Sequence, residues 1–388
     1  MLKLVHRRIL REHVLLFLII TGCLLGIIFT GRLLQMREVL FGQDVTVLTI
    51  IELFVYMTPF FLLLLMPIST MLSVFMTFLR MSTDQELTAL RAGGTSLYQL
   101  LPAPLTFCVL SMTLCYYIAF VGLGWGMDQF RDKLFNLAKE QTKIGMQAGV
   151  FNTQIPGITF FANNVDVEDG KLRSVFVQDK SNEKVIVNIV APEARIIADK
   201  QEAALKFVFN NGKIYRREAG KLDVLQFGSY TIGLPLESIF GSLAAKEKRA
   251  SQMSWAEMQK DLERRKEAKI MDERDSHKLL VEMQKRLSLP FSCFVLGLFA
   301  LPVACVFRGL KQQYGFMLSV GLFIVYYTLF SIGVALGEGG AADPVQALWG
   351  PNVLFLTVAL YGLHIASREK NMHLVQWFMH LKSRKAQA

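Results

Sequence analysis

The chain has 388 residues, of which 52% are hydrophobic, and its formal net charge is +10. Its apolar residues are gathered in long runs, which excludes an ordinary soluble globular domain. In a protein with such runs, an excess of Lys and Arg reflects cytoplasmic loops and contacts with lipid headgroups, so the charge does not indicate nucleic-acid binding.

Six apolar runs are long enough to cross a bilayer, which requires roughly 20 residues. They predict an α-helical membrane protein with six transmembrane helices, in two groups of three separated by a polar insert. The runs are 14–34, 53–79, 97–125, 287–307, 315–337 and 347–366. The predicted parts are transmembrane helices 1–3 with a short helix at 82–93 (1–125), a soluble β-domain (126–250), a charged helical connector (251–286), and transmembrane helices 4–6 with a basic tail (287–388).

The first apolar run follows four basic residues, as in a signal peptide, and residues 20–23 resemble a lipoprotein cleavage box. However, the run continues through Phe29, and no Ala occurs before Ala89. An Ala-x-Ala cleavage site is therefore absent, and we interpret this run as a retained first transmembrane helix.

Positive charge predicts the orientation of the chain. Basic residues lie at the N-terminus, in the segment 80–96 between spans two and three, after span four, and in the tail. The turn between spans five and six instead has Glu338 and Asp343. We therefore expect both termini and the segment 80–96 in the cytoplasm, and the insert on the opposite side.

The segment 80–96 is a short polar stretch between two long apolar runs. Thr83 and Glu86 have the spacing of a capping box, and Gly93-Gly94 is a natural helix stop. The pattern predicts a small helix and leaves two interpretations open. One is a tight structural turn, and the other is a docking element for a partner.

The predicted spans have no Asp, Glu, Lys or Arg near their centres, which argues against an ion-coupled transporter or a membrane-embedded hydrolase. The sequence has no GxxxxGK[ST] phosphate loop and no HExxH motif. All five cysteines lie within predicted spans, without metal-ligand spacing. We therefore expect no catalytic residue, no metal site and no cofactor in this chain.

The insert contains successive short runs typical of an antiparallel sandwich or barrel. Asp169-Gly170 predicts a hairpin, and Asn210-Asn-Gly212 predicts a second one. Four aromatic residues are interpreted either as ordinary core or as the lining of an opening for acyl chains: Phe207, Phe209, Phe227 and Tyr230. The connector that follows reads as a solvated helix, but Lys285-Arg286, before span four, is expected to meet headgroups or an anionic substrate.

The sequence resembles the LptF/LptG-type permeases of the lipopolysaccharide exporter. Residues 82–96 (STDQELTALRAGGTS) are similar to the family's cytoplasmic coupling helix, with its glutamate at Glu86. Residues 282–291 (EMQKRLSLPF) resemble the family's entry into span four, matching at Glu282, Arg286 and Ser288, and Ala300-Leu-Pro302 resembles a later step of that span. The segment 343–349 is closer to the LptF type than to LptG.

The resemblance implies a transmembrane permease subunit of an ABC transporter in the bacterial inner membrane. This transporter would extract lipopolysaccharide and pass it toward the outer membrane. The partners implied are an LptG-type chain in a heterodimer, a cytoplasmic ATPase dimer that uses ATP and Mg²⁺, a bitopic LptC-type protein and a periplasmic LptA-type bridge. The insert would be a β-jellyroll, and lipopolysaccharide would enter laterally between spans one and five of opposite subunits.

The resemblance also assigns site residues. Glu86 would dock on the ATPase, supported by the rest of its segment: Thr83, Leu87, Leu90, Arg91 and Gly93. Lipopolysaccharide phosphates would be bound by Arg32, Arg37 and Arg286, through the bidentate hydrogen bonds that arginine makes. Gln35 stands where the family has a second basic position. The alternative for Arg32 is a headgroup anchor, and the alternative for Glu86 is the capping box alone.

Two other functions stay open on sequence grounds. One is an ABC-type permease that acts on lipoproteins or cell-wall enzymes. The other is a membrane sensor or scaffold without a transport role, which a stable ATPase partner would exclude.

Overall fold

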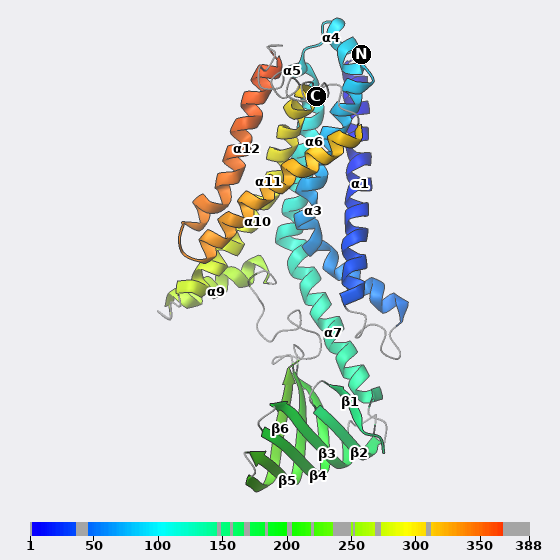
Figure 1. Ribbon diagram of the computed structural model, residues 1–388, viewed down its shortest axis with the longest axis vertical. Helices are drawn as coiled ribbons and strands as arrows, with labels where there is room; N and C mark the ends of the chain where they lie inside the picture. Colours follow the sequence, from blue (N-terminus) through cyan, green and yellow to red (C-terminus); the bar gives the residue numbers. More distant parts are fainter. Residues whose placement is uncertain are drawn as a thin grey trace, which may run out of the picture. The chain divides into compact units, whose positions relative to one another are not determined.

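The structure is a computed structural model. It describes residues 2–35, 46–145, 149–155, 158–166, 171–182, 185–199, 204–218, 221–235, 250, 253–267, 273–307 and 312–367. The chain divides into two compact units (Figure 1). One unit comprises Met1–Met127 and Arg249–Ala388, and the other comprises Asp128–Lys248.

The first unit is helical. Among the described residues, six helices are long and apolar enough to cross a membrane, which confirms the predicted six spans. Span three holds a π-helical segment, η1, between α6 and α7, and α7 continues into the second unit. The elements are α1 (Leu2–Gln35), α3 (Val47–Thr83), α4 (Glu86–Ala92), α5 (Leu97–Leu100), α6 (Pro102–Tyr117), η1 (Ile118–Gly122), α7 (Leu123–Gly145), α9 (Trp255–Glu267), α10 (Glu273–Val306), α11 (Gln312–Glu338) and α12 (Pro344–Ser367).

Helix α10 is the centre of this unit. It packs against α3, α6, α11 and α12, and its apolar side chains are buried almost throughout. At Gly297 an added Cβ would overlap the Cys108 thiol of α6, so glycine allows the two helices to approach closely. Close approach at small residues is a usual basis of helix packing where lipid replaces water.

A buried polar cluster joins α10, α11 and α12. The Tyr326 hydroxyl donates to Asn352 Oδ1 at 3.0 Å, and Asn352 Nδ2 donates to Ser288 Oγ at 2.8 Å. The Ser288 hydroxyl donates in turn to the Leu348 carbonyl at 2.8 Å. Because these groups are buried, each bond avoids an unsatisfied polar atom in an apolar interior. The cluster thus fixes the mutual rotation of three helices.

Helix α1 is joined to α3 by a second buried polar contact. The Ser73 hydroxyl donates to the His13 carbonyl at 2.6 Å. The Thr77 hydroxyl donates to the Ser73 carbonyl, so it accepts from His13 Nδ1 at 3.0 Å. Much of the remaining surface of α1 is apolar and exposed in this single chain. That surface is suited to lipid or to another membrane helix.

The second unit contains one antiparallel sheet in sequential strand order, which confirms the predicted antiparallel β-domain. Ile189 is buried and its neighbour Val190 is exposed, as in a strand whose successive side chains point to opposite faces. Phe207 and Phe209 are buried, whereas Tyr230 is exposed. The strands are β1 (Asn152–Ile155), β2 (Ile158–Asp166), β3 (Lys171–Asn182), β4 (Val185–Asp199), β5 (Ala204–Glu218) and β6 (Lys221–Pro235).

The hairpin predicted at residues 210–212 is wrong, because β5 runs straight through them. Asn210 pairs with Ser229 and Gly212 pairs with Phe227 in one continuous register. A Cβ at position 212 would overlap the Phe227 ring and the Val190 carbonyl, so this glycine serves close packing within the sheet and does not form a turn. The turn predicted at Asp169-Gly170 lies outside the described residues.

Close approach of α11 and α12 yields a stability prediction. An added Cβ at Gly333 would overlap the Ala347 carbonyl of α12, whereas at exposed Gly321 of the same helix it would meet nothing. Gly333→Ala should therefore lower the free energy of unfolding by about 1–3 kcal/mol, the usual cost of overpacking. Gly321→Ala is the matched control and should be neutral or slightly stabilising. Thermal unfolding in detergent measures both, and equal midpoints would contradict the packing described.

Candidate functional site

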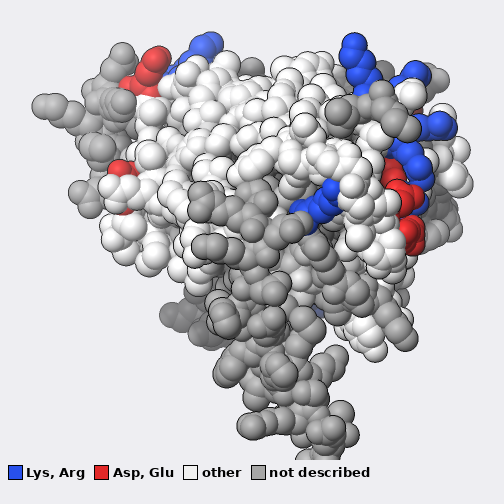
Figure 2. Space-filling model, turned by 90° about the horizontal axis from the view of Figure 1, so that it is seen from above, with Lys and Arg blue, Asp and Glu red and all other residues white. Residues whose placement is uncertain are grey.

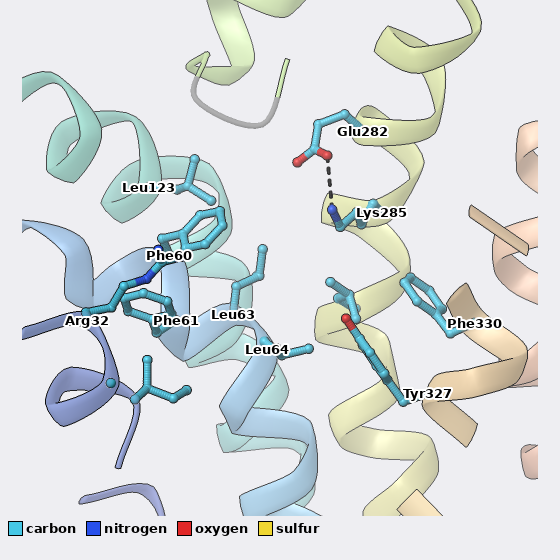
Figure 3. A pocket seen from close by; sticks show the side chains of 13 residues that line it. Arg32, Phe60, Phe61, Leu63, Leu64, Leu123, Glu282, Lys285, Tyr327 and Phe330 are labelled. Carbon is cyan, nitrogen blue, oxygen red and sulfur yellow. Dashed lines mark hydrogen bonds and ion pairs between the residues drawn. The ribbon is translucent and has the colours of Figure 1, made fainter. Parts of the chain in front are cut away.

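A cavity of about 450 Å³ lies between α1, α3, α7, α10 and α11 (Figure 3). Most of its lining is apolar or aromatic, and its charged members are Arg32, Glu282 and Lys285. An apolar enclosure with a few placed charges is the usual chemistry of a site for an amphipathic ligand. The remaining lining residues are Ile28, Gly31, Phe60, Phe61, Leu63, Leu64, Leu123, Leu289, Tyr327 and Phe330.

Arg32 lies near the C-terminal end of α1, in the cavity wall, as one of the three predicted phosphate-binding arginines. Its guanidinium stands over the Phe61 ring of α3, with 5.7 Å between the guanidinium carbon and the ring centroid. This cation–π contact contributes about 0.5–2 kcal/mol and restrains the position of the guanidinium in the cavity wall. Arg37 lies outside the described residues, and Gln35 is the last residue of α1.

Arg286 lies in α10 but does not line the cavity, which differs from the exposed position expected from the sequence. Helix α10 begins at Glu273, so residue 286 falls well inside the helix bundle, where its side chain is 0% exposed. The guanidinium donates to the Ala250 carbonyl at 3.3 Å and lies 3.7 Å from Glu282 Oε1. Its phosphate-binding role stays a prediction, and in this conformation the group is enclosed by protein.

Of the Lys285-Arg286 pair, which the sequence predicted to meet headgroups or an anionic substrate, Lys285 is the member that lines the cavity. It lies on the cavity side of α10, and its ammonium is 3.3 Å from Glu282 Oε2. Arg32 and this Lys285–Glu282 pair stand on opposite sides of the cavity, with α3 side chains between them (Figure 3). The signal in the sequence was the i,i+3 spacing of Glu282 and Lys285 on one helix face.

The segment 80–96 forms helix α4 and the turns around it. The capping box predicted for Thr83 and Glu86 is wrong, because α3 continues through Thr83 and its hydroxyl donates to the Leu79 carbonyl. Gln85 precedes α4 in a left-handed conformation and makes no side-chain cap. The predicted stop is confirmed, since α4 ends at Ala92 and Gly94 has a φ of +83°.

Glu86 is held by α1. Its carboxylate forms an ion pair with Arg8 at 3.1 Å. A second pair, Arg80 with Glu12, joins the end of α3 to α1, and His6 Nε2 lies 2.7 Å from the Gln99 carbonyl. Figure 2, which views this end of the molecule, shows acidic and basic side chains gathered together at one edge. Sequence reasoning did not find Arg8, because its partner is 78 positions away.

The other predicted coupling residues divide between the anchored and exposed sides of α4. Leu87 is buried in the core, and Leu90 packs against it. Arg91 is partly buried near the helix end, and Gly93 is exposed just after it. The exposed face of α4 is formed by Thr88, Ala89 and Ala92, which have small side chains. The helix is therefore anchored firmly on one side and accessible on the other.

Helix α1 connects the α4 segment with the cavity. Arg8 contacts α4 near one end of this helix, and Arg32 lines the cavity near the other. At 1.5 Å per residue they are about 36 Å apart along the helix axis.

Among the described residues, no group of three or more His, Cys, Asp or Glu is arranged to hold a metal ion.

The chain matches the family model "Lipopolysaccharide export system permease LptF/LptG" over residues 7–364. It belongs to the LptF/LptG family. Its relatives include the lipopolysaccharide export system permease protein LptF of Escherichia coli (strain K12) and that of Shigella flexneri. Each is 21% identical over 371 residues, covering 92% of this chain and 93% of the relative. As an LptF/LptG-family permease with six apolar helices, the chain is a multi-pass protein of the inner membrane.

Removing the buried guanidinium should destabilise this permease strongly. Arg286→Met leaves the Glu282 carboxylate without its buried partner, and breaking such a pair costs about 3–5 kcal/mol. The double variant Glu282→Met, Arg286→Met removes both charges and should recover part of that loss. Thermal unfolding in detergent measures the difference. An Arg286→Met single variant as stable as wild type would contradict the pairing.

Proposed function

We propose that this LptF/LptG-family chain is the non-catalytic transmembrane subunit of an ATP-driven transporter that extracts lipopolysaccharide from the inner membrane. The observation that carries the proposal is the cavity between α1, α3, α10 and α11, which combines apolar walls with a cation on each of two sides. Lipopolysaccharide carries both acyl chains and phosphate groups. Its acyl chains would contact the apolar walls, and its phosphates would contact the two cations.

The cations suit the phosphates in different ways. Arg32 offers a planar fork that matches a phosphate bidentately, and its contact with Phe61 keeps that plane oriented. The aromatic and leucine side chains of α3 and α11 provide the surface for acyl chains. Arg37 and Arg286 remain further candidates from the sequence. In this proposal, lipopolysaccharide enters laterally between spans one and five of opposite subunits.

The energy for extraction comes, in this proposal, from a separate cytoplasmic ATPase dimer that uses ATP and Mg²⁺. The exposed face of α4 would dock on that partner, and Glu86 would transmit the force. Two ion pairs attach α1 to this region, so a displacement of α4 would pull on the helix that carries Arg32 into the cavity. This gives a mechanical route from ATPase closure to the substrate site.

The complete assembly would contain an LptG-type chain as the second half of a heterodimer. An LptC-type membrane protein and an LptA-type periplasmic bridge would receive the lipid through the β-domain. The family resemblance implies a β-jellyroll for this domain. Both termini and α4 would be cytoplasmic, and the β-domain periplasmic. The two relatives reported above are both named LptF, which supports the LptF type for this chain.

Charge reversal at Glu86 tests the coupling role. Glu86→Arg should abolish transport while the chain still inserts and folds, because an exposed ion pair contributes only about 0.2–1 kcal/mol to stability. Lipopolysaccharide release from inner-membrane vesicles measures transport, and co-purification with the ATPase measures docking.

The control is the charge swap Arg8→Glu, Glu86→Arg, which restores an ion pair within the chain but not the surface offered to a partner. It should remain inactive. Recovery of transport by the swap would assign Glu86 to internal support of α4, and wild-type transport by Glu86→Arg alone would exclude any coupling role. Lipopolysaccharide-stimulated ATP hydrolysis by the purified complex distinguishes a transporter from a sensor or scaffold.

A further inference from the structure

Three charged side chains of α10, two of which line the cavity, form a graded series from exposed to buried. The Lys285 side chain is 33% exposed, the Glu282 side chain is 11% exposed, and Arg286 is fully enclosed. One carboxylate therefore stands between a cation that reaches the cavity and a cation that does not. Its two oxygens are divided between them, with Oε2 toward Lys285 and Oε1 toward Arg286.

We propose that Lys285 is an anion-binding residue of the cavity. Without ligand, its ammonium pairs with the Glu282 carboxylate, and a ligand phosphate displaces that carboxylate. Arg286 positions Glu282 for this exchange. The ligand class is an amphipathic lipid with at least one phosphate. The inference deepens the proposed function and rests on it for the identity of that lipid.

Exposure to the cavity favours exchange at Lys285, because its side chain is partly exposed whereas that of Arg286 is enclosed. The Lys285–Glu282 separation of 3.3 Å is longer than the 2.7–2.9 Å usual for a strong charge-assisted hydrogen bond. A phosphate carries about −1.5 to −2 charges and three acceptor oxygens, so it attracts an ammonium more strongly than one carboxylate oxygen does. The flexible stem of lysine also allows its ammonium to turn from one acceptor to another.

Arg286 limits the cost of that exchange. An isolated carboxylate inside the bundle would be strongly unfavourable. Glu282 retains the Arg286 guanidinium when Lys285 leaves, and this guanidinium is held in place by its bond to the Ala250 carbonyl. An arginine that is enclosed by protein in this conformation thus has a role in binding the ligand, as a positioning residue.

The arrangement also explains why the cavity has a cation on two sides. Arg32 is presented by α1 from one side, and Lys285 by α10 from the other (Figure 3). A lipid with two phosphates can meet both at once, whereas a lipid with one phosphate meets only one of them. The pair therefore favours bisphosphorylated lipids over ordinary phospholipids.

The test is a binding measurement on the full-length chain, purified with its co-expressed partner chains in nanodiscs. The probes are bisphosphorylated lipid A, the same lipid after removal of its phosphates, and phosphatidylglycerol. Lys285→Gln should weaken binding of bisphosphorylated lipid A by about tenfold or more, the effect of losing a hydrogen bond to a charged group. It should leave the dephosphorylated lipid unaffected. Lys285→Arg should retain binding, and Lys278→Gln, on an exposed position of the same helix, is the matched control.

The variant Glu282→Gln tests whether the ligand phosphate competes with the Glu282 carboxylate for Lys285. It removes the competing charge but keeps an oxygen near Arg286, so bisphosphorylated lipid A should bind more tightly than to wild type. Unchanged or weaker binding in a folded Glu282→Gln protein would overturn the exchange. Wild-type affinity in Lys285→Gln would overturn the anion site while leaving the proposed function intact.

Comparison of the three lipid probes distinguishes a failure of this inference from a failure of the proposed function on which it rests. If phosphatidylglycerol binds as tightly as lipid A, with the same loss in Lys285→Gln, the anion site stands and its ligand is an ordinary headgroup. If wild type binds neither phosphorylated lipid more tightly than the dephosphorylated one, the anion site is wrong. If wild type binds no form of lipid A, the proposed lipopolysaccharide substrate is wrong as well.

Discussion

A fully buried guanidinium is the constraint around which the helical unit is arranged. Arg286 requires a carboxylate and further acceptors inside the bundle, and Glu282 and the Ala250 carbonyl provide them. This requirement fixes the rotation of α10 about its own axis. Ser288, half a turn further along, then joins α11 and α12 through Asn352. The same rotation sets Lys285 and Leu289 in the cavity wall.

Helix α1 has a different role, because little of it is buried within this chain. Its attachments are concentrated in its N-terminal half, where Arg8 and Glu12 pair with α4 and α3 and where His13 bonds to Thr77. Its other end carries Arg32 to the cavity, where Arg32 stands over the Phe61 ring and Phe29 stacks on Phe54 of α3. A continuous helix with contacts at both ends is suited to transmit movement between them.

The sequence predicted the six spans and the antiparallel domain because both depend on periodic patterns of apolar residues. It failed where distant parts of the chain decide the outcome. The capping box at Thr83 was overridden by the continuation of α3, and the turn at Gly212 was overridden by packing against Phe227.

The candidate site shows the same division between local pattern and distant contact. Arg32, predicted to bind phosphate, lines the cavity, and of the Lys285-Arg286 pair α10 presents Lys285 there and turns Arg286 inward. The i,i+3 spacing places Glu282 and Lys285 on one face of α10. Local sequence did not show whether that face turns toward the cavity or toward the protein interior. The Arg8–Glu86 pair needed the folded chain, since no local pattern connects residues so far apart.

The central claim is that lipopolysaccharide occupies the cavity between α1, α3, α10 and α11. The most direct measurement places a photoreactive amino acid at Tyr327, in the cavity wall, and separately at Tyr361, which is exposed on α12 outside it. After irradiation in cells, the account predicts a lipopolysaccharide adduct at position 327 that is absent or much weaker at 361. Equal adducts at both positions, or an adduct at 361 alone, would contradict it.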